Sequence, residues 1–260
     1  MTRPLLLHPL DWNPAYRIIP TRFPAIDLFE SVADPKDWEA LLALESRTND
    51  RIRDEVGDIS LIPPKERAMG PGCTFRGRAK ITCAVQVILL RPLMSVRHPN
   101  DQVILAQRLI NAAFTHPHPG RFSTAQRGAF YAADREAVAV AEVAYHAALN
   151  AGFDQLEPLD LEYQVLKVRV NGNFHDLRQL GPRSPITHSV EYGRSQELSL
   201  SLRQEGSKGV VYHSVRVSEG DCIAAFTPTV LKHCRHARYL TFRWDGKRIV
   251  SIVETRPYRL

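Results

Sequence analysis

Apolar residues recur at helical spacing along the first part of the chain. Residues 34–53, 101–114 and 135–149 place apolar side chains three or four positions apart, as on the buried face of a helix. Asp34 fits an N-cap position, and the proline after it suits the first helical turn. Residues 150–152, Asn-Ala-Gly, end the third segment. We therefore expect three helices here, and extended or irregular chain before the first.

Strand-like patterns dominate the second part of the chain. Asn171-Gly172, which follows an alternating run, predicts a hairpin turn, and Asp245-Gly246 predicts another. The expected strands are residues 163–170, 210–217, 221–228, 239–244 and 248–254. Because the helices come first and the strands later, the pattern predicts an α+β fold rather than alternating βαβ units.

Composition and charge indicate a globular protein and exclude several other classes. The chain has 260 residues, of which 44% are hydrophobic and 24% charged, which excludes a wholly disordered chain. We expect a single unit of 260 residues. No apolar run approaches the ~18–20 residues of a membrane-spanning helix. The N-terminus lacks a signal-peptide pattern and the four cysteines are sparse, so we expect a cytoplasmic protein. A net charge of +6 suits a polyanionic ligand but does not indicate nucleic-acid binding.

The most basic stretch covers residues 73–100. It contains Arg76, Arg78, Lys80, Arg91 and Arg97, and the next acidic residue is Asp101. We interpret it as a solvated insertion around one buried strand or helix. The alternative is a basic patch for an acidic partner.

The common ligand motifs are missing or weak. The sequence contains neither a Gly-x-Gly-x-x-Gly motif nor a Walker loop. The run Lys232–His236 has two histidines, but no matching Cys/His pair lies at zinc spacing, so we interpret it as an exposed loop and expect no metal. Ser123, Ser214 and Cys222 do not lie in a nucleophile elbow.

Three residues at regular spacing form the most informative pattern. Arg121 follows a glycine, Tyr131 comes ten residues later in a short apolar run, and Glu142 eleven after that in an Ala- and Val-rich helix. A carboxylate on or beside an apolar helix face is costly unless it is paired or used in chemistry. Spacing alone leaves two alternatives open. Glu142 could form a structural pair with Arg121, and Tyr131 could be an ordinary core residue.

Together with Tyr212–Arg216, this series resembles the RES domain family, named for its Arg, Glu and Ser. The opening residues 16–20, Tyr-Arg-Ile-Ile-Pro, are similar to the first strand of that family. The resemblance covers about residues 12–30 and 108–250. One departure is that Phe122 and Ser123 stand where the family usually has Trp and Asn.

The resemblance implies an ADP-ribosyltransferase-like core of mixed and antiparallel strands with flanking helices, plus a helical N-terminal region. It divides the unit into an N-terminal strand and helix region (1–72), an insertion (73–106) and an NAD-site core (107–260). It also implies an NAD-consuming toxin that cleaves the nicotinamide–ribose bond, paired with an Xre-like helix-turn-helix antitoxin.

Carried over residue by residue, the resemblance gives five site residues. Arg121 would bind the pyrophosphate and Glu142 would stabilise an oxocarbenium-like charge. Tyr131 would stack on nicotinamide or bond the ribose. Ser214 would bond ribose hydroxyls or hold Glu142, or else be a solvent-facing strand residue. Arg17 would be a second phosphate contact, or alternatively part of a structural salt bridge.

The identity of the acceptor remains open at this point. Phosphate would give NAD phosphorolysis, water would give hydrolysis, and a protein side chain would make the chain a mono-ADP-ribosyltransferase. A further alternative is an inactive module that binds an acidic partner.

Overall fold

The computed structural model describes residues 5–21, 61–63, 66, 99–181 and 184–256. The expected helix at 34–53, and with it the helical N-terminal region, lies outside these residues. So does the basic stretch up to residue 98. Of the expected insertion, only residues 99–106 are described, and they belong to a helix.

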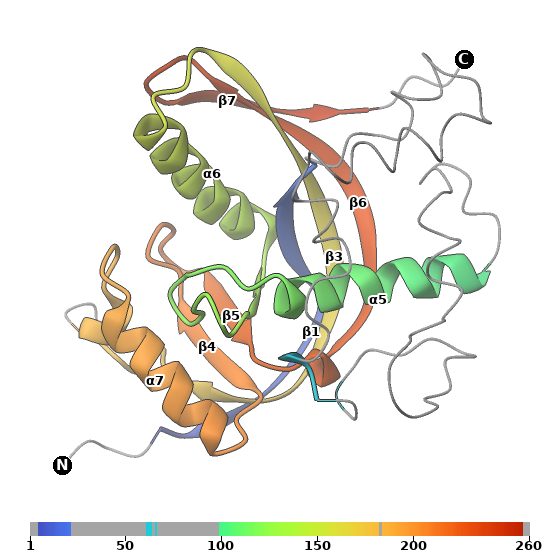
Figure 1. The fold of residues 1–260 in the computed structure, drawn as a ribbon, viewed down its shortest axis with the longest axis vertical. Helices are drawn as coiled ribbons and strands as arrows, with labels where there is room; N and C mark the ends of the chain where they lie inside the picture. Colours follow the sequence, from blue (N-terminus) through green and yellow to red (C-terminus); the bar gives the residue numbers. More distant parts are fainter. Residues whose placement is uncertain (1–4, 22–60, 64–65, 67–98, 182–183, 257–260) are drawn as a thin grey trace.

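The described residues contain seven strands and three α-helices (Figure 1). Their order is β1 (Leu7–Pro20), α5 (Pro99–Thr115), β2 (Phe130–Ala133), α6 (Glu136–Phe153), β3 (Leu159–Asp176), α7 (Gly193–Gln204), β4 (Gly209–His213), β5 (Asp221–Ala225), β6 (Leu231–Trp244) and β7 (Ile249–Thr255). Short 3-10 turns span Pro185–Thr187 and Pro228–Val230. The α+β prediction and two of its helices are confirmed.

The strands form one mixed sheet in the order β1-β2-β5-β4-β3-β6-β7. The β3–β4 pair is parallel and the other pairs are antiparallel. Strand β1 also pairs with β3 along most of its length, so the sheet curves back on itself. The segment between β4 and β5 packs against the first turn of α6, since a Cβ atom at Gly220 would lie 2.6 Å from Val138 Cγ2.

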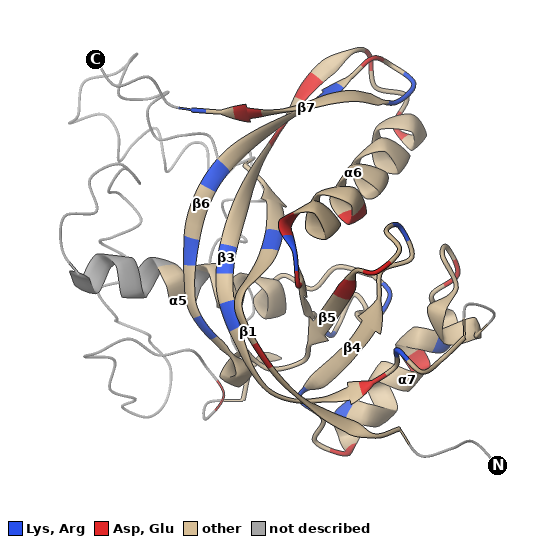
Figure 2. Ribbon diagram, turned by 180° about the vertical axis from the view of Figure 1, so that it is seen from behind, with Lys and Arg blue, Asp and Glu red and all other residues tan. Residues whose placement is uncertain are grey.

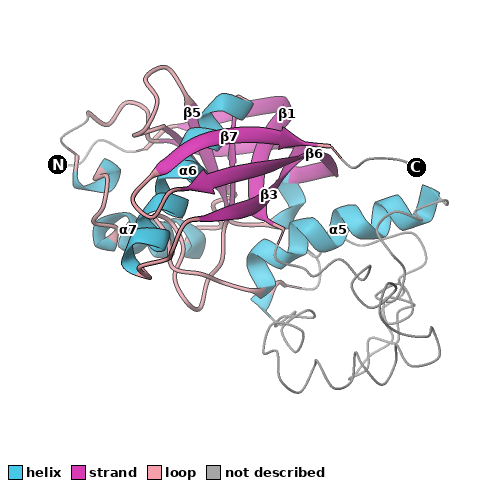
Figure 3. Ribbon diagram, turned by 90° about the horizontal axis from the view of Figure 1, so that it is seen from above, coloured by secondary structure: helices cyan, strands magenta, loops and turns pink. Residues whose placement is uncertain are grey.

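Two hydrophobic clusters lie on opposite faces of the sheet. Helices α6 and α7 cover one face and α5 covers the other (Figures 1 and 3). Alternation along β2 shows the division, because Phe130 and Ala132 belong to the α5 cluster while Tyr131 and Ala133 belong to the α6 cluster. The face of the sheet on which a strand residue lies therefore follows from its position in the alternation along the strand.

The hairpin predicted at Asn171-Gly172 is wrong. Strand β3 continues through both residues, and Gly172 pairs with Leu10 of β1. A Cβ atom at Gly172 would lie 2.7 Å from Val230 Cγ1, so this glycine permits close packing rather than a turn. The hairpin at Asp245-Gly246 is confirmed, since it joins β6 to β7.

Three other strand predictions need correction. The run Lys232–His236 lies within β6 and is not a loop, and its Cys234 is buried. Strand β4 ends at His213 and β5 at Ala225, both earlier than expected. Residues 214–217 instead form a turn, and this turn contributes to the site described next.

Candidate functional site

A tight turn before β2 positions Arg121. The backbone N–H of Gly120 donates to Ser123 O at 3.0 Å, and the Ser123 hydroxyl donates to His118 O at 2.7 Å. A Cβ atom at Gly120 would lie 2.9 Å from Ser123 Oγ and 3.0 Å from the Tyr131 hydroxyl, so only glycine fits without displacement. The turn leaves the Arg121 side chain 8% exposed.

Tyr131 holds this turn against the sheet. Its hydroxyl accepts a hydrogen bond from Phe122 N–H at 2.9 Å and lies 3.0 Å from Ser123 Oγ. Because the Ser123 proton is directed to His118 O, the Tyr131 hydroxyl is the donor to Ser123 Oγ. Burial raises the pKa of Tyr131. Both hydrogen bonds of the hydroxyl are therefore made within the protein.

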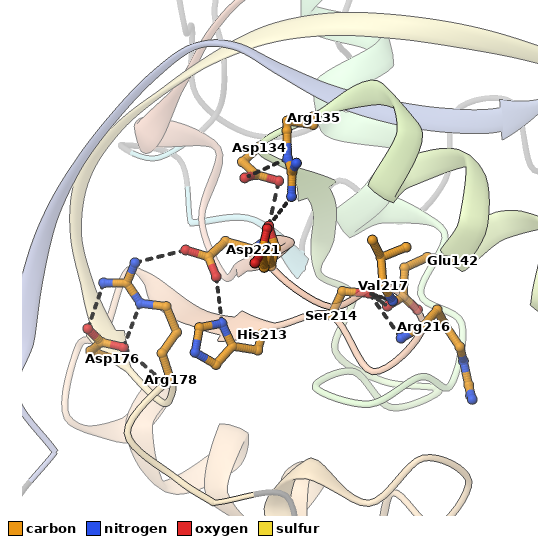
Figure 4. Close-up of polar contacts among 11 residues, drawn as sticks. Asp134, Arg135, Glu142, Asp176, Arg178, His213, Ser214, Arg216, Val217 and Asp221 are labelled. Carbon is orange, nitrogen blue, oxygen red and sulfur yellow. Dashed lines mark hydrogen bonds and ion pairs between the residues drawn. The ribbon is translucent and has the colours of Figure 1, made fainter.

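Glu142 and Ser214 meet across the site (Figure 4). Ser214 Oγ accepts from the backbone N–H groups of Arg216 and Val217, both at 3.1 Å. With two donors already directed at the oxygen, its proton points to Glu142 Oε1, 2.6 Å away. That distance is typical of a hydroxyl bound to a carboxylate. The turn after β4 thus fixes the carboxylate of α6.

The Glu142–Arg121 pair considered above is not found in the described part of the chain. The Arg121 guanidinium instead donates to the backbone carbonyl of His188, and Glu142 accepts from Ser214. Arg121 also lies over the ring of Tyr192, 5.0 Å from its centroid. The carboxylate and the guanidinium therefore remain separate groups in one site.

Arg216 is a second cation in the site, which sequence reasoning did not assign. Its Nη2 donates to Ser189 O at 2.8 Å, and its guanidinium lies 3.3 Å from the centroid of the Tyr145 ring. Desolvation lowers the pKa of His146, Glu142 opposes this shift, and the charges of Arg216 and Arg121 add to it. Glu142, Arg121 and Arg216 thus share one electrostatic environment around His146.

Arg17 does not join this group. On β1 it faces the α5 cluster, since it pairs with Leu166 and lies 4.5 Å from the centroid of the Phe130 ring. Its Nη1 donates to Tyr131 O at 3.1 Å, and burial lowers its pKa to about 10. The period of two along β1 separates it from the face of Glu142, so the structure does not support the expected phosphate contact.

A second polar group lies at the neighbouring strand ends (Figure 4). His213 Nδ1 is 2.8 Å from Asp221 Oδ1, and Asp221 Oδ2 accepts from Arg178 Nη1 at 2.9 Å. Arg178 also forms a bidentate pair with Asp176, which raises the pKa of the guanidinium and lowers that of the carboxyl. The carboxylates of Asp176 and Asp221 are therefore both bonded to neighbouring side chains. Within the described residues, no cluster of three or more His, Cys, Asp or Glu could hold a metal ion.

Comparison with known proteins identifies the family. The family model of the RES domain matches residues 97–245, more than half of the chain. The chain belongs to the RES domain family. This confirms the resemblance inferred from the motifs, and the positions expected to form the site, Arg121, Tyr131, Glu142 and Ser214, lie within the matched range.

The chain is similar to a curated protein and, more distantly, to a solved structure. An uncharacterized protein of Sinorhizobium fredii, y4oC, is 27% identical over 234 residues, covering 90% of this chain and 84% of the relative. A solved structure, the M. tuberculosis MbcT-MbcA toxin-antitoxin complex, matches at 15% identity with a TM-score of 0.34. That match covers 45% of this chain and 71% of the solved one. No helix in the described part of this RES protein is long and apolar enough to cross a membrane.

Proposed function

We propose that this RES protein consumes NAD by cleaving its nicotinamide–ribose bond, as the toxin of a toxin–antitoxin pair. The observation that carries the proposal is the 2.6 Å hydrogen bond by which Ser214 holds the Glu142 carboxylate, in the turn that also carries Arg216. Membership of the RES family supports the same assignment.

Glu142 supplies negative charge where the reaction develops positive charge. As the bond between nicotinamide nitrogen and ribose carbon breaks, its electron pair leaves with nicotinamide and the ribose becomes oxocarbenium-like. A fixed carboxylate stabilises that charge without reorganising during the reaction. Ser214 is a positioning residue, since its hydroxyl directs one carboxylate oxygen and is itself held by two backbone amides.

Arg121 and Tyr131 form the part of the site that binds the phosphates of NAD. The Arg121 guanidinium can form two parallel hydrogen bonds to phosphate oxygens, which a lysine cannot. Tyr131 keeps the Arg121 turn in place through its hydroxyl, while its ring lies on the same sheet face as α6. Its contribution to NAD binding is then the placement of Arg121 together with ring contact.

The acceptor of the ADP-ribosyl group completes the reaction. An oxygen of inorganic phosphate or of water forms a bond to the ribose carbon as the bond to nicotinamide breaks, neutral nicotinamide leaves, and the proton of the acceptor is released to solvent. Transfer to a protein side chain shares the same first step. No metal is required by this scheme, because the carboxylate and the guanidiniums provide the charges.

The test is to incubate the purified protein with NAD, with and without phosphate, and to measure products by mass. ADP-ribose 1-phosphate would identify phosphorolysis, and free ADP-ribose would identify hydrolysis. Isotope-labelled NAD distinguishes protein modification, since label would then remain on protein. Unchanged NAD in every arm would contradict the proposed function and favour a binding module.

A further inference from the structure

Arg216 has unused hydrogen-bonding capacity. Its Nε atom is buried and has no hydrogen-bond partner in the described part of the chain. Its Nη2 donates only to a backbone carbonyl, that of Ser189, and the flat guanidinium stacks on Tyr145. Among the described residues no carboxylate forms an ion pair with it. A half-buried cation without an anion is costly, and its cost falls when an anionic ligand binds.

Arg121 likewise has no carboxylate partner among the described residues. It is 8% exposed, and its guanidinium donates to the backbone carbonyl of His188. His188 and Ser189 are consecutive, and consecutive Cα atoms are about 3.8 Å apart. The two guanidiniums therefore donate to adjacent residues of one segment, so a diphosphate, which carries oxygens on two linked phosphorus atoms, could accept from both.

The turn that carries Arg216 also holds the carboxylate. The backbone N–H of Arg216 donates to Ser214 Oγ, which in turn donates to Glu142. The position of Arg216 is therefore coupled to that of Glu142 through two hydrogen bonds. A ligand that binds Arg216 through an anionic group would therefore place the adjacent part of the molecule next to Glu142.

From these contacts we propose that Arg216 and Arg121 together bind the diphosphate of NAD. The carbonyls of His188 and Ser189 occupy in the free protein the positions that phosphate oxygens take in the complex. Binding exchanges neutral carbonyl acceptors for phosphate oxygens, which add the attraction between opposite charges and can accept from a guanidinium in a bidentate fork. This inference rests on the proposed function, since NAD supplies the diphosphate.

The test compares NAD binding by calorimetry in wild type, Arg216→Gln and Arg216→Lys. Arg243→Gln is the matched control, because Arg243 is an exposed arginine of β6 that pairs with Asp160. Loss of hydrogen bonds to a charged group predicts about 10- to 100-fold weaker binding for Arg216→Gln. Arg216→Lys should lose less, since it keeps the charge, and Arg243→Gln should match wild type.

Binding of a second ligand shows whether Arg216 contacts the diphosphate of NAD or another part of it. Nicotinamide riboside lacks the diphosphate, so its affinity should be the same in wild type and in the Arg216 variants. Equal NAD affinity of wild type and a folded Arg216→Gln would overturn the inference. If Arg216→Gln does not fold, equal affinity of wild type and Arg216→Lys would overturn it in the same way. Failure of wild type to bind NAD at all would instead contradict the proposed function.

Discussion

At the residue scale, the site depends on a few polar atoms whose partners are fixed. The Tyr131 hydroxyl and Ser214 Oγ each bond to backbone amides on one side and to a side chain on the other. The spacing of Arg121, Tyr131 and Glu142 could be read from the sequence. The partners of Arg121 and Glu142 could not, because they lie 67 and 72 residues away, and the Phe122 amide that bonds to Tyr131 is a backbone group without a sequence signal.

Arg121→Ala should weaken NAD binding by about 1.5–3 kcal/mol, the range for a hydrogen bond to a charged group. Arg121→Lys should restore only part of that loss, because lysine cannot form the bidentate fork. Calorimetry measures both. Equal affinity of wild type and Arg121→Ala would remove Arg121 from the site.

Tyr131→Phe should lower the free energy of unfolding by about 1–3 kcal/mol, because Phe122 N–H and Ser123 Oγ each lose a partner. Denaturant unfolding measures the change. Tyr239→Phe is the control, since no hydrogen bond of its hydroxyl is found in the described residues, and it should change stability little. A Tyr131→Phe protein as stable as wild type would show that the hydroxyl does not hold the turn.

At the scale of elements, segments between strands complete the site. The turn at 214–217 and the stretch at 188–192 contact the arginines and the carboxylate, yet neither has apolar periodicity. Periodicity predicted α5 and α6, and the dipeptide Asp245-Gly246 predicted the β6–β7 hairpin. The dipeptide Asn171-Gly172 misled because a glycine needed for close packing against Val230 has the same local sequence as a turn.

The stretch at 188–191 offers a prediction at this scale. His188 Nδ1 accepts from the N–H groups of Val190 and Glu191, which closes a turn and presents the His188 and Ser189 carbonyls to the arginines. His188→Ala should loosen this turn and weaken the hydrogen bonds from the arginines to the two carbonyls. NAD affinity should then rise by about 2- to 10-fold, because breaking these bonds on NAD binding costs less free energy.

Val190→Ala is the control in the same stretch, because Val190 is exposed and its N–H still bonds to His188. It should bind NAD as wild type does. Unchanged or weaker NAD binding by His188→Ala would indicate that the carbonyls do not compete with the ligand.

At the scale of the whole molecule, one curved sheet brings distant segments together. Glu142 and Ser214, which form a hydrogen bond, lie 72 residues apart along the chain. The α+β class could be predicted from the order of patterns along the chain. The return pairing of β1 with β3 could not, because register depends on contacts between residues more than 140 positions apart.

The basic residues of the molecule are relevant to its proposed partner. Lysine and arginine positions recur along the ribbons of β3 and β6 (Figure 2), which suits an acidic segment of an antitoxin. If the chain is a toxin, its expression alone should lower cellular NAD and arrest growth, and co-expression of an Xre-like antitoxin should restore both. Harmless expression with unchanged NAD would contradict the toxin assignment.

The most direct test of the catalytic account is nicotinamide release by Glu142→Gln. Glutamine keeps the shape and accepts the Ser214 hydrogen bond, but it lacks the negative charge. Because that charge acts in the transition state, the rate should fall by at least ~10²-fold while NAD affinity and melting temperature change little. A folded Glu142→Gln protein that releases nicotinamide at the wild-type rate would contradict the account.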